Sequence, residues 1–171
     1  MVRSLSFLQL FVILAVGYIG GVLLYRGIPD ADFSFIVQIY DSRAAQISSA
    51  SLLIQLATVL SFYAAAFVLS VSRKTRWSVM LVGALKAVLF GLASAHILAG
   101  GVNMLAYTGW WFPFKFLGTF LVLLFCWTLS PPFFTKRSVK RTQNLKVPLM
   151  IAGIGLLLFF ADKAVYNLLG G

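Results

Sequence analysis

Ionisable side chains inside long apolar segments are the first candidates for chemistry in this sequence. The four that stand out are Lys86, His96, Lys115 and Asp162. Burying a charge at membrane depth is costly, so such a residue indicates a functional site or a buried ion pair. We therefore take these four positions as candidate functional or ion-pair residues.

The depths of these residues follow from helix geometry. At a rise of about 1.5 Å per residue, Lys86 lies about 14 Å and His96 about 28 Å beyond the start of their apolar segment. Asp162 lies about 22 Å beyond the start of the last segment, near the face where the segment of Lys115 begins. This predicts a cluster of Lys115, Asp162, Lys163 and His96 at one face. We favour a structural ion pair there over a solute or proton site.

Lys86 has two interpretations, and the sequence leaves both open. A lysine at this depth marks a functional site by default. Alternatively, its long side chain snorkels to the cytoplasmic head groups.

Enzyme chemistry finds little support in the residue types. The chain has no glutamate, and its single histidine and single cysteine, Cys126, stand in different apolar segments. One histidine provides neither bis-histidine haem ligation nor a His-rich metal site. Asp162 is the one acid within an apolar segment, so no carboxylate pair is expected there. We predict no catalytic residue, no metal site and no cofactor.

The composition is that of a membrane protein. Of the 171 residues, 61% are hydrophobic and 11% are charged, against roughly 25% charged in soluble domains. A helix needs about 20 mostly apolar residues to cross a bilayer core. We therefore predict an all-α, polytopic integral membrane helical bundle that forms a single transmembrane domain over residues 1–171. The five predicted spans are residues 7–24, 49–70, 77–100, 110–130 and 147–169.

The basic residues predict the orientation. Nine of the 14 lie on the side shared by the N-terminus, the second loop and the fourth loop. The opposite loops hold only Arg26 and Arg43, beside three aspartates. Positive loops stay in the cytoplasm, which places the N-terminus inside and the C-terminus outside. The basic loops explain the net charge of +10, so we expect no nucleic-acid partner. The expected partners are the lipid bilayer and other membrane proteins.

Two connections between spans have open interpretations. The first carries Asp30, Asp32 and Asp41 among aromatic residues, which is typical of a helix on the membrane surface or of an ordered loop. Residues 100–110 are apolar yet contain helix breakers, so they form a surface loop or a re-entrant segment. Trp110 then begins a group of aromatic residues that resembles a membrane-interface belt.

Small residues at every fourth position indicate helix faces that approach a neighbour closely. The third span has Gly83, Ala87, Gly91, Ala95 and Ala99, and the first span has Gly17 and Gly21. In lipid, helices associate through close van der Waals contact, for which such residues are typical. We predict that these positions pack helices within the bundle rather than in a dimer.

Two stretches resemble the stage II sporulation protein M family of bacterial membrane proteins. They are Gly17-x-x-Gly20-Gly21 in the first span and Leu85-Lys86-Ala87-Val88-Leu89-Phe90-Gly91-Leu92 in the third. The order of spans and the basic loop are also similar to that family. The resemblance implies a non-enzymatic scaffold in the membrane of a spore-forming bacterium that helps to localise cell-wall hydrolases during engulfment. It also implies that Lys86, Gly91 and Asp162 are structural or partner-contacting positions.

Two functions compete at this point. A scaffold predicts helix packing without a ligand-sized cavity and stable complexes with other membrane proteins. A small-solute transporter, or the substrate-binding membrane subunit of a modular importer, predicts a pocket between helices lined by polar groups. The residues expected to line it are His96, Asn103, Lys115 and Asp162. The sequence favours the scaffold, because polar residues within the spans are few and no internal repeat occurs.

Overall fold

The computed structural model describes residues 2–28, 36, 40, 52–72, 74–100, 107–130 and 145–168. Most of them belong to five long helices, α1 (Val2–Tyr25), α3 (Leu52–Val71), α4 (Val79–Ala99), α6 (Phe112–Leu129) and α7 (Lys146–Leu168). A 3₁₀ turn, η1 (Arg76–Ser78), precedes α4, and a π-helical turn, η2 (Tyr107–Trp111), precedes α6. The described residues contain no strand, which confirms the all-α prediction for this part of the chain.

Each long helix contains a stretch that is long and apolar enough to cross a membrane. These stretches are Leu8–Tyr25, Leu53–Val71, Arg76–Ala99, Tyr107–Leu129 and Lys146–Val165. Within the described residues, their number agrees with the five spans predicted from the sequence.

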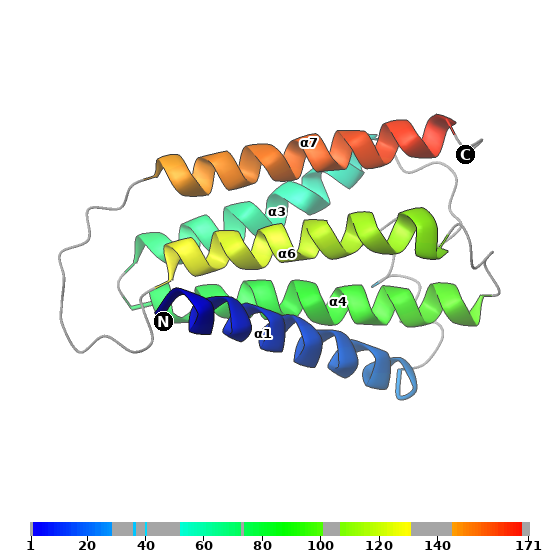
Figure 1. Cartoon of the computed structure of the whole chain (residues 1–171), viewed down its shortest axis with the longest axis horizontal. Helices are drawn as coiled ribbons and strands as arrows, with labels where there is room; N and C mark the ends of the chain where they lie inside the picture. The colour runs from blue at the N-terminus through cyan, green and yellow to red at the C-terminus, as the bar shows by residue number, and fades with distance from the viewer. Residues whose placement is uncertain are drawn as a thin grey trace.

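The helices form an elongated bundle (Figure 1), and α4 is the most buried of them. α4 packs against α1, α3 and α6, and α7 packs against α6. Burial follows this order, since 56% of the apolar stretch of α4 is buried, against 22% in α1, α3 and α7. α1 and α7 lie at opposite edges of the bundle.

The outer surface of the bundle is apolar. Large hydrophobic side chains are exposed on all five helices, among them Val16 on α1, Leu53 on α3, Leu81 on α4, Leu117 on α6 and Leu157 on α7. Monomers that dissolve in water rarely expose contiguous apolar surface on this scale.

Glycines allow α1 and α4 to pack backbone against backbone. Gly17 and Gly21 face the side of α4 that carries Ala87 and Gly91. A Cβ built on Gly17 would lie 2.6 Å from the Cβ of Ala87, and one built on Gly91 would lie 2.9 Å from the Cα of Tyr18. These distances are too short for real Cβ atoms, so the contact depends on glycine.

The small-residue series of α4 serves more than one neighbour. A Cβ built on Gly83 would lie 2.7 Å from Cδ2 of Leu123 on α6, whereas Ala87 and Gly91 face α1. Ala95 is half-buried and Ala99 is exposed. Each step of four residues turns the helix by about 40° beyond a full turn. The series therefore passes from α6 to α1 and then to the surface.

Several sequence-based predictions concern residues that the structure does not describe. The proposed surface helix before residue 49, apart from Ile36 and Tyr40, and the proposed re-entrant segment at residues 101–106 lie outside the described residues. After the second of these segments, η2 leads into α6. Pro113 stands in the first turn of α6, where its missing N–H breaks no helical hydrogen bond.

Candidate functional site

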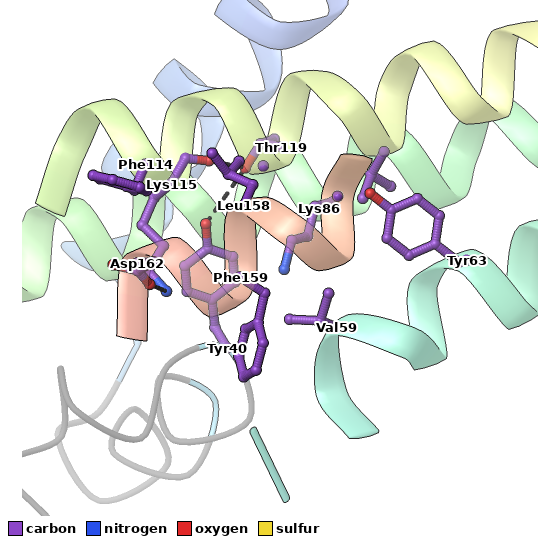
Figure 2. Close-up of a pocket in the computed structure, with 13 residues that line it drawn as sticks. Tyr40, Val59, Tyr63, Lys86, Phe114, Lys115, Thr119, Leu158, Phe159 and Asp162 are labelled. Carbon is purple, nitrogen blue, oxygen red and sulfur yellow. Dashed lines mark hydrogen bonds and ion pairs between the residues drawn. The ribbon is translucent and has the colours of Figure 1, made fainter. Parts of the chain in front are cut away.

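A small pocket of about 50 Å³, partly open to the outside, lies between α3, α6 and α7 (Figure 2). Lys86 of α4 and Tyr40 also line it. The other lining residues are Val59 and Tyr63 of α3; Phe114, Lys115, Gly118, Thr119 and Val122 of α6; and Gly155, Leu158, Phe159 and Asp162 of α7.

Helical periodicity explains why these residues share the pocket. Lys115, Gly118, Thr119 and Val122 follow the spacing i, i+3, i+4, i+7, and so do Gly155, Leu158, Phe159 and Asp162. Each set therefore lies on one face of its helix. Each face carries one charged residue and one glycine. Because α6 and α7 run in opposite directions, the charged ends of the two faces meet (Figure 1).

Lys115 and Asp162 form an ion pair in this pocket. The Nζ atom of Lys115 lies 3.4 Å from Oδ2 of Asp162, and the two side chains are only 16% and 6% exposed. Pairing offsets the loss of hydration that each charge suffers on burial. The structure thus brings together two of the four ionisable residues selected from the sequence.

Lys86 is also buried, with 7% of its surface exposed. Its Nζ lies 4.3 Å from the centroid of the Tyr40 ring and 4.4 Å from that of Phe62. An aromatic face attracts an ammonium group by about 2 kcal/mol when water is excluded. The Tyr40 hydroxyl lies 3.4 Å from Oγ1 of Thr119, which fixes the ring beside the pocket. The Lys86 ammonium thus lies among aromatic rings, whereas the snorkelling interpretation places it at the head groups.

His96 does not line the pocket, although its depth along α4 suggested that it belongs with Lys115 and Asp162. It is half-buried, and its ring contacts that of Tyr25 of α1, with centroids 6.2 Å apart. Rotation about the helix axis explains the difference, because His96 follows Lys86 by ten residues, which is about 280° around the helix. Asn103, the fourth residue expected at a solute site, lies outside the described residues.

A second polar group joins α1, α4 and η2. The hydroxyl of Tyr18 lies 2.9 Å from Oγ of Ser94, and Ser94 is also hydrogen-bonded to the hydroxyl of Tyr107. Rings of Phe90 and Trp111 pack beside these tyrosines. Buried hydroxyl groups are normally satisfied in this way. We assign this group a structural role.

The sequence analysis missed the aromatic rings that hold Lys86 and the two glycines of the pocket. Tyr40 and Phe62 come from different segments, and no spacing rule connects them to Lys86. Gly118 and Gly155 did leave a signal, since each stands in an i, i+3, i+4, i+7 set with a charged residue at one end. Two such sets on helices of opposite direction predict a common polar pocket.

Metal ligands do not gather in the described parts of the chain, where no three His, Cys, Asp or Glu side chains come together. Comparison of the chain with protein family models, with curated proteins and with solved structures gives no match. The resemblance to stage II sporulation protein M stays a prediction from residues 17–21 and 85–92.

Proposed function

We propose that this chain is a multi-pass protein of the bacterial cytoplasmic membrane that binds a small solute with an anionic group. It acts as a small-solute transporter or as the substrate-binding membrane subunit of a modular importer. The observation that carries the proposal is that two ammonium groups, those of Lys86 and Lys115, line one pocket between helices.

The membrane location rests on the exposed surface and on the helix lengths. Five helices contain apolar stretches of 18 to 24 residues, close to the length of about 20 residues that a bilayer core requires. Their exposed side chains include many large hydrophobic residues, such as Val68 on α3 and Leu149 on α7. Lipid tails, rather than water, are the solvent that such a surface suits.

The proposed orientation has the N-terminus in the cytoplasm and the C-terminus outside, because the basic loops lie on the N-terminal side. Lys74→Cys and Arg26→Cys test it, since both positions are exposed and stand at opposite ends of the bundle. In intact cells, a membrane-impermeant maleimide is expected to label R26C alone, and K74C only after the membrane is opened. The native Cys126 is buried and gives little background. Labelling of K74C from outside would contradict the orientation.

The chemistry of the pocket favours an anionic ligand. Lys115 forms an ion pair with Asp162. The ammonium group of Lys86 lies against the rings of Tyr40 and Phe62. The hydroxyl-bearing residues Thr119 of α6 and Tyr63 of α3 also line the pocket and supply further hydrogen-bonding groups. A carboxylate or phosphate group fits this combination, because charge attraction is strong where water is excluded.

Lys86→Met is the sharpest test of this function. Methionine keeps an unbranched chain of similar length, and removing the desolvation cost of the buried ammonium offsets the lost attraction of the Tyr40 and Phe62 rings. The variant is therefore expected to unfold near the wild-type temperature but to lose binding by about tenfold or more. Thermal shifts in lipid nanodiscs, with a panel of small carboxylates and phosphates, measure both properties.

The matched control is Lys74→Met, which removes an exposed lysine outside the pocket. This variant should keep the wild-type thermal shifts. If no small anion stabilises the wild-type protein, or if K86M responds to the same anions equally, the proposal of a water-soluble anionic ligand is wrong.

A scaffold function is the second candidate, favoured by the resemblance of residues 17–21 and 85–92. Its distinguishing result is recovery of cell-wall hydrolases with the protein purified from native membranes in mild detergent. Recovery of an ATPase module would instead support the importer subunit.

A further inference from the structure

Two contacts between α3 and α7 close the pocket at its two ends. At one end, Nζ of Lys163 donates a hydrogen bond to Oε1 of Gln55 at 3.2 Å. At the other, the hydroxyl of Tyr63 packs directly on Gly155, where no Cβ could fit. Tyr63 follows Gln55, and Lys163 follows Gly155, by eight positions, or about 12 Å of helix. The two contacts therefore bound a stretch between the helices, which we call the α3–α7 window.

The lining of the pocket lies between these two contacts. Val59 on α3 and Leu158, Phe159 and Asp162 on α7 all fall within the window (Figure 2). Behind them, α6 provides the back wall with Gly118 and its neighbours. The pocket is thus flanked by α3 and α7, with α6 behind it.

The exposed faces of the two helices that flank the window are apolar, whereas the pocket between them contains charged groups. Ile54 and Leu60 of α3 and Ile154, Leu157 and Phe160 of α7 are exposed large hydrophobic residues on the two flanking helices. The ion pair between Lys115 and Asp162, and the ammonium of Lys86, lie in the pocket. A ligand that matches both regions has a charged head group in the pocket and a hydrocarbon chain against the apolar outer faces of α3 and α7.

We propose that the ligand is a single-chain amphiphile with an anionic head, taken sideways from the bilayer through the α3–α7 window. The head lies beside Lys86 and Lys115, and the chain passes between α3 and α7 into the lipid. This inference rests on the proposed function and specifies its ligand. A water-borne solute approaching from the end of the bundle would meet the hydrogen bond between Lys163 and Gln55.

Gly118→Leu blocks the pocket with little harm to the fold. The one atom within 4 Å of a Cβ built on Gly118 is Cδ2 of Leu158, at 3.9 Å, which is an ordinary van der Waals contact. The rest of the leucine side chain then occupies the pocket. Gly153→Leu is the matched control, because Gly153 is exposed on α7 and a Cβ there meets nothing within 4 Å.

The test uses a diazirine-bearing hexadecanoate in phosphatidylcholine vesicles that contain the full-length protein. Photolabelling is expected on residues 55–63, 115–122 and 155–162, to fall about tenfold in G118L, and to stay unchanged in G153L. Labelling spread over the exposed faces of all helices, and equal in the three proteins, would overturn the proposal. Thermal unfolding of G118L verifies that the variant is folded.

Butyrate and inorganic phosphate separate this proposal from the broader one. If these water-soluble anions stabilise the wild-type protein but not G118L, while hexadecanoate gives no specific labelling, the pocket binds solutes and the amphiphile is wrong. If neither class acts through the pocket, both proposals fail. Specific labelling by hexadecanoate, without any effect of the small anions, supports the amphiphile.

Discussion

Replacing Gly91 by alanine is expected to lower the free energy of unfolding by about 1–3 kcal/mol, and by more if the helices cannot separate. The added Cβ would strike the carbonyl oxygen of Tyr18 and lie 2.8 Å from its carbonyl carbon. These are backbone atoms, so no side-chain rotation relieves the overlap, and α1 must move away from α4. Thermal or denaturant unfolding in detergent measures the loss.

Gly20→Ala provides the control for this prediction. Gly20 lies on α1, next to Gly21, but a Cβ built on it meets nothing within 4 Å. Alanine there should stabilise the helix by up to about 1 kcal/mol, because glycine is the poorer helix former. Equal effects of G91A and G20A would contradict the close α1–α4 contact.

Replacing Asp162 by asparagine is expected to destabilise the protein by about 3–5 kcal/mol. The substitution keeps the shape of the side chain but removes the charge that faces Lys115 at 3.4 Å. The ammonium of Lys115 is then left buried beside a neutral amide, which compensates its lost hydration poorly. The midpoint of thermal unfolding in detergent should fall accordingly.

A double-mutant cycle with Lys115→Met isolates the ion pair. The double variant D162N/K115M should recover much of the loss, because it leaves no uncompensated charge at this position. Lys74→Met, at an exposed site, should change the stability little. Unchanged stability of D162N would mean that the pair contributes nothing to the fold.

Helix number and the depth of polar residues were predictable from the sequence. Five apolar helices of membrane-crossing length occur where hydropathy predicts spans. Distance along the helix also placed Lys115 and Asp162 at similar depth, and the structure pairs them. Both results depend only on rise per residue, which varies little between helices.

Rotation about the helix axis was the part that the sequence left undetermined. His96 has the depth expected for the cluster but contacts Tyr25 of α1 instead. The small-residue series of α4 likewise divides between Leu123 on α6 and Tyr18 on α1. Which face of a helix meets which neighbour depends on the packing of the whole bundle, and hydropathy in a uniformly apolar span carries little of that information.

The transporter alternative predicted a pocket lined by Lys115 and Asp162, but the shape of the pocket and its other lining residues were not predicted, because they depend on how the helices pack. The pocket exists where Gly118 has no side chain and where Tyr63 crosses Gly155. The aromatic partners of Lys86 are equally hidden, since Tyr40 precedes α3 and Phe62 lies within it. Such contacts join distant segments and appear only when the helices are assembled.

The close contact of α1 with α4 has a consequence for how the protein is made. The bonded residues Tyr18 and Ser94 are 76 positions apart, so a ribosome needs about 4–15 s to travel from one to the other. If α1 enters the membrane as we propose, it has not yet met its main partner during that interval, and the face with Gly17 and Gly21 is open to the lipid. The surface that closes the finished bundle is therefore the one through which an unfinished chain is most prone to join another nascent helix.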